Sequence, residues 1–256
     1  MRAELLKRRG PRHGLAAALQ VLACAVLLSG MAPPAVADGK DNDQPDVAPP
    51  HSRPDGASYN TWATRWWQWA FSIPANINPL LDDTGQNADV GQSGDVWFLA
   101  GTWGNGTVDR KVAIPADKAL FFPVINSVYV NTPAYGDNPW SEDQENFLRA
   151  YNAAAIDGAT DVACQVDGQA VKHLDHYRFA TPDDREYMVD MPDNNLFGID
   201  PGTYGPTEDD GYYLMLAPLS PGEHTIHFIG ALASGFALDV TYHITVKDDH
   251  RDKGKH

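Results

Sequence analysis

The sequence predicts a mainly β protein, an antiparallel two-sheet β-sandwich of Ig-like or jelly-roll-like type with two helical decorations. Three observations lead to this class. Short runs of β-branched, aromatic and other apolar residues recur through most of the chain, and turns rich in Gly, Pro, Asn and Asp separate them. These runs do not alternate with helical segments, as they would in a parallel α/β fold. A partly closed barrel is the alternative arrangement of the same strands.

The first element, residues 1–37, has the three parts of a secretory signal. Several basic residues precede an apolar run over 15–28, and Ala35-Val36-Ala37 offers the small side chains that a signal peptidase needs. The apolar run is shorter than the ~20 residues of a membrane-spanning helix. We therefore expect cleavage after Ala37, a secreted or periplasmic location, and no membrane insertion once the signal is removed.

The regions next to the expected domain are polar. Residues 38–57 are rich in Pro and Asp without periodicity, which predicts a disordered leader, and residues 247–256 read as a disordered tail. Residues 58–246 then form a single β-sandwich domain. This length is sufficient for a substantial hydrophobic core.

The first helix is expected over 59–72, because Ser58 is a favourable N-cap and Pro74 stops the pattern. Tryptophans at helical spacing predict an apolar stripe that packs against a sheet: Trp62, Trp66 and Trp69. Trp67 lies off this stripe, so it is expected at the margin or in solvent.

After this helix the chain reads as a succession of short strands. They are expected over 96–103, 108–114, 119–130, 161–166, 169–179, 186–189, 212–216, 224–229 and 238–246. Asp167-Gly168 is the strongest hairpin signal in the chain. The segment 218–246, a Ser-Pro-Gly turn followed by two alternating strands, resembles the closing hairpin of many bacterial Ig-like and other β-sandwich modules. That resemblance implies architecture only.

A second helix is expected over 142–155, because Ser141 and Gln144 have the spacing of a capping box. Its narrow apolar stripe is expected to consist of Phe147, Leu148, Tyr151 and Ala155.

Charge and cysteine usage exclude several classes of protein. Asp and Glu number 34 against 19 Lys and Arg, so the formal net charge is −15 at pH 7, and the signal carries a large share of the basic residues. Such a surface repels phosphate backbones, which argues against a nucleic-acid partner. Cys24 would leave with the signal, and Cys164 between apolar neighbours is expected to be a buried thiol.

The sequence carries no motif of a known catalytic class, such as GxSxG, HExxH, CxxC or a phosphate-binding loop. Catalysis would therefore use residues that the fold brings together. The densest polar group lies in an expected strand and consists of His173, Asp175 and His176. These residues are the acid-base candidates for a secreted hydrolase or lyase that acts on a polysaccharide.

Acidic, glycine-rich loops are the metal candidates. The segment 190–211 offers hard oxygen ligands of the kind that calcium prefers, among them Asp193, Asp200 and Asp209. Their spacing does not match an EF-hand, so solvated turns are the competing interpretation. With calcium, the protein would be a metal-stabilised structural or adhesion domain.

Aromatic residues form the third group of candidate site residues. Four tryptophans lie in or beside expected loops, or on strand faces that the core does not require: Trp67, Trp97, Trp103 and Trp140. Flat aromatic faces stack on sugar rings, while nearby amides and carboxylates bind hydroxyls. Our first hypothesis is therefore a secreted module that binds an extracellular polysaccharide or another cell-surface ligand through these aromatics, and the hydrolase or lyase remains open beside it.

Overall fold

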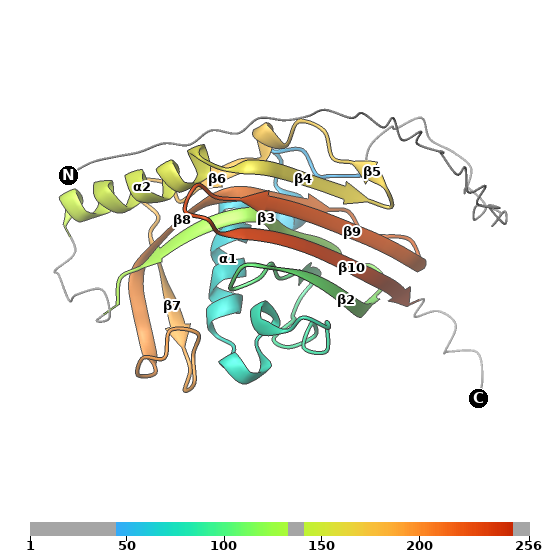
Figure 1. The fold of residues 1–256 in the computed structure, drawn as a ribbon, viewed down its shortest axis with the longest axis horizontal. Coiled ribbons are helices and arrows are strands. Elements are labelled where there is room, and N and C mark those ends of the chain that lie inside the picture. Colours follow the sequence, from blue (N-terminus) through green and yellow to red (C-terminus); the bar gives the residue numbers. More distant parts are fainter. Residues whose placement is uncertain (1–44, 133–140, 248–256) are drawn as a thin grey trace, which may run out of the picture. The chain divides into compact units, whose positions relative to one another are not determined.

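The computed structural model describes residues 45–132 and 141–247, all of which belong to one compact unit. The expected signal peptide, Trp140 and the tail after Lys247 lie outside the described residues. The described part is mainly β, with two sheets and two α-helices, which confirms the predicted class at this level (Figure 1). Within it, no helix is both long and apolar enough to cross a bilayer.

The first sheet, sheet A, follows the order β1, β3, β8, β6, with β7 also paired to β8. Its strands are β1 (Val96–Phe98), β3 (Ala119–Val130), β6 (Arg178–Ala180), β7 (Tyr187–Met191) and β8 (Gly202–Leu216).

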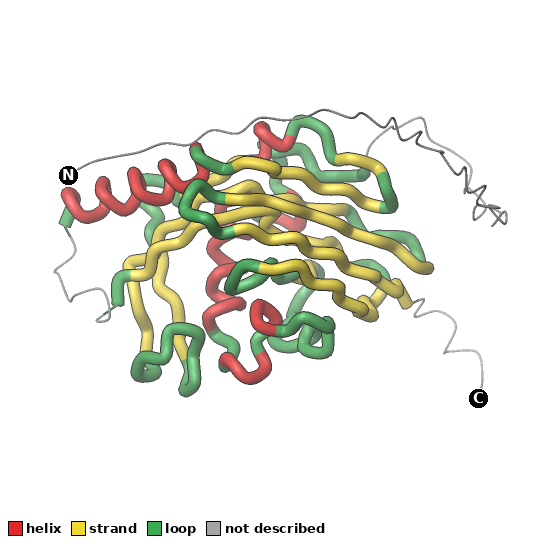
Figure 2. Tube along the Cα trace, viewed as in Figure 1, coloured by secondary structure: helices red, strands yellow, loops and turns green. Residues whose placement is uncertain are grey.

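The second sheet, sheet B, follows the order β2, β10, β9, β4, β5. Its strands are β2 (Gly106–Pro115), β4 (Thr160–Val166), β5 (Gln169–Ala170), β9 (Gly222–Ala231) and β10 (Ala237–Lys247). Figure 2 shows β2, β10, β9 and β4 running side by side across the molecule. The hairpin expected at Asp167-Gly168 joins β4 to β5.

Both sheets are mixed, so the prediction of purely antiparallel sheets was wrong. β1 runs parallel to β3, and β2 runs parallel to β10 over their whole length. The alternation of apolar and polar residues fixes which strand face is buried, but it does not fix the direction of the neighbouring strand.

The described elements form three layers. One hydrophobic core lies between the two sheets, and a second lies between sheet A and α1 (Tyr59–Phe71). α2 (Glu142–Asp157) packs on β3 and β8. It lies on the face of sheet A that sheet B also covers, because alternate residues of β8 contact α2 at one end and sheet B at the other.

α1 is buried almost all round, which explains why Trp67 is not exposed as expected. Ser58 caps the helix by accepting a hydrogen bond from Thr61 N. Tryptophan indole groups donate to backbone carbonyls of the loops that cover α1: Trp62 to Pro54, Trp66 to Leu99 and Trp69 to Val90. Trp67 is only 4% exposed, because loops and sheet A together enclose the helix.

The expected disordered leader is ordered where the structure describes it. Val47 bridges Leu216, Ala48 N donates to Met215 O at 2.8 Å, and Tyr59 Oη donates to Ala48 O at 2.6 Å. Backbone pairing with the end of β8 therefore orders a segment whose polar composition alone predicts disorder.

α2 begins and ends close to the expected residues, but it buries a different face. The buried side chains are Leu148, Asn152 and Ile156, while Phe147 and Tyr151 are 66% and 56% exposed. The predicted stripe was therefore wrong by about one residue, which is 100° of helix rotation. Two short stretches of 3-10 helix, Ala75–Ile77 and Pro79–Leu81, follow α1.

Candidate functional site

Three consecutive carboxylates lie in the middle of β8, in a segment that the sequence analysis assigned to a loop. Glu208, Asp209 and Asp210 are 1%, 4% and 3% exposed. Because strand side chains alternate, Glu208 and Asp210 project toward α2 and Asp209 projects toward α1. Buried carboxylates require partners, so the surroundings of each one define its role.

Asp210 is fully paired and has a structural role. Arg178 of β6 donates from Nε and Nη2 to its two oxygens at 3.0 and 2.7 Å. The same guanidinium donates from Nη1 to Asp157 at the end of α2, at 2.5 Å. This bidentate pair with its third partner ties α2 to sheet A.

Asp209 accepts three hydrogen bonds from hydroxyl groups. The donors are Tyr213 Oη at 2.6 Å, Thr181 Oγ1 at 2.8 Å and Tyr187 Oη at 3.1 Å. Burial raises the pKa of Asp209 to about 6, although these hydrogen bonds oppose the shift. Tyr213 Oη also accepts from Trp67 Nε1 at 3.1 Å, so Trp67 belongs to this buried network.

The calcium ligands expected from sequence do not come together. Asp193 and Asp200 are exposed in the connection between β7 and β8, whereas Asp209 is enclosed beneath α1. The reason is that β8 begins at Gly202, so the strand carries Asp209 away from the loop. The structure therefore offers no shared site for these three carboxylates.

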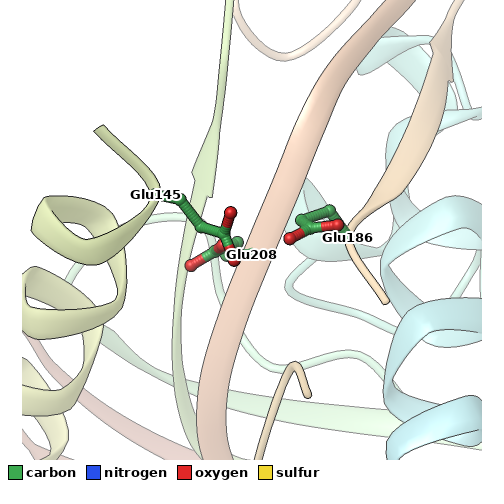
Figure 3. A group of neighbouring side chains, drawn as sticks. All are labelled: Glu145, Glu186 and Glu208. Carbon is green, nitrogen blue, oxygen red and sulfur yellow. The ribbon is translucent and has the colours of Figure 1, made fainter. Parts of the chain in front are cut away.

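Glu208 lies at the centre of a different carboxylate group, which we call the three-glutamate site: Glu145, Glu186 and Glu208. Glu145 comes from the first turn of α2, Glu186 directly precedes β7, and Glu208 comes from β8; Figure 3 shows the three carboxylates converging. One oxygen of each lies within 4.8 Å of the others. No other group of this kind occurs among the described residues.

Among the described residues, one cation, Arg149 of α2, forms ion pairs with the three-glutamate site. Its Nη2 lies 2.9 Å from Glu145 Oε1, 3.4 Å from Glu186 Oε1 and 3.2 Å from Glu208 Oε1. Its Nη1 also lies 3.4 Å from the exposed Asp183. One guanidinium therefore forms ion pairs with several carboxylates, and the carboxylates of the site outnumber their cation.

Glu208 is the least satisfied member. Both of its carboxylate oxygens are buried, and neither has a hydrogen-bond partner among the described residues. Burial raises its pKa to about 7, and the charges of Glu145 and Glu186 add to this rise while Arg149 opposes it. The hydrogen bond from Arg149 lowers the pKa of Glu145.

The tryptophans nominated as sugar-stacking residues are mostly part of the core. Trp67 and Trp97 are 4% and 8% exposed, so their ring faces are not available to a ligand. Trp103 is half-buried and packs edge-to-face on Phe71 and Phe197. Large aromatic side chains fill cores as readily as they line binding sites, and sequence position alone does not separate the two uses.

The exposed edge of α1 instead forms an aromatic groove of about 440 Å³, which we call the α1 groove. Trp62, Trp69 and Phe98 supply aromatic surface, and Arg65, Gln68 and Asp95 are among its polar residues. The guanidinium carbon of Arg65 lies 4.5 Å from the Trp62 ring centroid. Aromatic surface beside exposed polar groups is the usual composition of a small-ligand site.

The histidine candidates lie at the surface rather than in a strand. Residues Leu174–Tyr177 form a 3-10 turn that begins after His173, whose φ is 57°. The His173 and His176 rings stack at 5.5 Å, and His176 Nε2 lies 3.6 Å from Asp175. All three side chains are exposed, so the predicted strand was wrong, although the three residues do stay together.

Comparisons with protein-family models, with curated proteins and with solved structures find no match to this chain. Any statement about function therefore depends on the chain's own geometry.

Sequence reasoning missed the three-glutamate site. One local signal was present, since Glu145 and Arg149 have the i,i+4 spacing of a helical ion pair. The contribution of Glu186 and Glu208 depends on tertiary structure.

Proposed function

We propose that the protein is a secreted or periplasmic binding module that recognises a polysaccharide, or another sugar-bearing cell-surface ligand, in the α1 groove. The observation that carries this proposal is the meeting of aromatic edges with exposed polar side chains in one hollow. The two stacked sheets are compatible with a β-sandwich of Ig-like or jelly-roll-like type, a class that often supports such loops and grooves.

The chemistry of the groove suits a sugar. Trp62 and Trp69 are only 8% and 7% exposed, so they offer ring edges rather than faces to the C–H groups of a pyranose, and Gln68 offers an amide for its hydroxyls. Arg65 and Asp95 add one charge of each sign, which favours a polar, hydrogen-bonding ligand over a purely apolar one. The hydrolase or lyase stays the second candidate through His173, Asp175 and His176, which lie together at the surface.

Retention on an array of immobilised polysaccharides tests the proposal. We expect wild-type protein to be retained on at least one polysaccharide, and the double variant Arg65→Ala/Asp95→Asn to lose at least tenfold in affinity with an unchanged melting temperature. Both residues are at the surface, so their removal should leave the core intact.

A matched double variant supplies the control. Arg185→Ala/Asp184→Asn removes an exposed pair of the same charges outside the α1 groove and should bind like wild type. Equal losses in the two double variants, or no retention on any polysaccharide, would reject the groove. Release of reducing or unsaturated ends from the array, abolished by His173→Ala, would favour the enzyme instead.

A further inference from the structure

The charges of the three-glutamate site do not balance. Three carboxylates face one guanidinium, that of Arg149, and the remaining charge is that of two negative groups. Glu208 is almost completely buried, while the side chains of Glu145 and Glu186 are 19% and 23% exposed. Uncompensated charge in such surroundings is costly unless a proton or a cation neutralises it.

The second observation is that Glu208 accepts no hydrogen bond from the described residues, although Arg149 forms an ion pair with its Oε1. The two carboxylate oxygens of Glu208 are aimed into the site. Buried carboxylates ordinarily accept several hydrogen bonds. A carboxylate that is 1% exposed and has one ion pair but no hydrogen bond from any described residue points to a further electropositive partner.

The spacing of the oxygens fits a divalent cation. Calcium binds oxygens at about 2.4 Å, so ligands on opposite sides of the ion are about 4.8 Å apart. One oxygen from each glutamate lies within that span of the other two. Carboxylates that bind through both oxygens can supply further coordination, and water can complete the shell at the partly exposed side.

Arg149 also has partners other than the three glutamates. Its Nη1 donates to Thr181 O at 2.5 Å, its Nη2 donates to Pro182 O at 3.1 Å, and Asp183 lies next to Nη1. These partners lie on the side of residues 181–183. Because Nη2 is within 3.4 Å of all three glutamates, calcium binding requires the guanidinium to move away from them.

We propose that Glu145, Glu186 and Glu208 bind one calcium ion, which links α2, β8 and the start of β7. The ion supplies the positive charge that Arg149 alone does not. This site is distinct from the expected one at Asp193, Asp200 and Asp209. It does not depend on the α1 groove, so each proposal can fail without the other.

Calorimetric titration of the chelator-stripped chain with calcium chloride at pH 8 tests the inference. We expect one ion per chain in wild type and at least a tenfold weaker affinity in Glu208→Gln, because the amide keeps the shape of the side chain and removes its charge. Glu186→Gln provides a second test at a more exposed position, in case the buried substitution impairs folding. Calcium should raise the melting temperature of wild type and have a smaller effect on both variants.

Two controls make the result specific. Asp193→Asn/Asp200→Asn removes the exposed loop carboxylates, and Glu142→Gln removes an exposed charge from the same first turn of α2; both should bind calcium like wild type. The proposal is overturned if wild type gives neither heat nor a melting shift with millimolar calcium. It is also overturned if Glu208→Gln and Glu186→Gln bind as tightly as wild type.

Discussion

Trp67 connects α1 to the buried carboxylate of β8. Its Nε1 donates to Tyr213 Oη, which in turn donates to Asp209. Its ring stacks on Phe71 with centroids 5.0 Å apart and meets Trp66 edge-on at 4.8 Å. One side chain thus combines a core contact with a place in the polar network, and the two contributions can be separated by substitution.

Trp67→Ala should cost about 3 to 5 kcal/mol of unfolding free energy, the usual range for a large aromatic that leaves a cavity. Trp67→Phe keeps an aromatic ring but removes the donor to Tyr213. The lost hydrogen bond should reduce the unfolding free energy by about 1 kcal/mol, in addition to the loss from the smaller ring. Urea unfolding measures both, with exposed Gln68→Ala on the same helix as the control. A Trp67→Ala midpoint equal to that of Gln68→Ala would contradict this packing.

At the scale of elements, α2 is oriented by polar contacts as much as by its apolar residues. Asn152 donates to Glu208 O at 3.0 Å and accepts from Ser127 Oγ at 2.8 Å. Arg149 faces the three-glutamate site on the same side of the helix. These contacts leave Phe147 and Tyr151 in solvent and turn Leu148 inward.

The effect of truncation should follow this orientation. Leu148→Ala is expected to destabilise the protein by about 2 to 4 kcal/mol, because Leu148 is only 5% exposed. Phe147→Ala, one residue earlier and 66% exposed, should change stability by no more than about 0.5 kcal/mol. Thermal or urea unfolding of the two variants tests which face of α2 is buried. A larger loss of stability in Phe147→Ala than in Leu148→Ala would favour the face expected from sequence.

Local signals predicted the existence and limits of most elements. The expected helix over 59–72 is Tyr59–Phe71, the strand over 119–130 is observed at those residues, and Cys164 is buried as expected. Caps, turns and alternation act within a few residues, so they can be recognised in one sequence. The expected helix over 142–155 likewise has the correct start.

The misassigned parts depend on contacts between distant segments. The acidic stretch before Gly211 was assigned to a loop because carboxylates are rarely buried without partners. Those partners are Arg149, Arg178 and Thr181, which no local pattern links to β8. For the same reason the three-glutamate site and the parallel pairing of strands could not be predicted from spacing.

At the scale of the whole molecule, two of the three buried carboxyls of β8, those of Glu208 and Asp209, should govern how stability varies between pH 5 and 8. Glu208 and Asp209 have pKa values raised to about 7 and about 6, above the ordinary values of 4.5 and 3.8. The folded chain therefore holds protons that the unfolded chain releases in this range. By linkage, the stabilisation is complete below the ordinary pKa values and is lost as the pH rises through the raised ones.

Unfolding in urea, measured with chelator present, should thus show a midpoint that falls from pH 5 to pH 8. Each pKa unit corresponds to about 1.4 kcal/mol, so the total fall is on the order of a few kcal/mol. Glu208→Gln cannot lose this proton and should show a clearly smaller fall, while the exposed Glu142→Gln on α2 should follow wild type. Carboxyls with lowered pKa values, such as Glu145, stabilise the fold fully once the pH is above their ordinary pKa, and they lose this effect only at lower pH. They should therefore not reverse the trend between pH 5 and 8. A wild-type midpoint that is constant or rises over this range would show that Glu208 and Asp209 are already charged in the folded protein at pH 5.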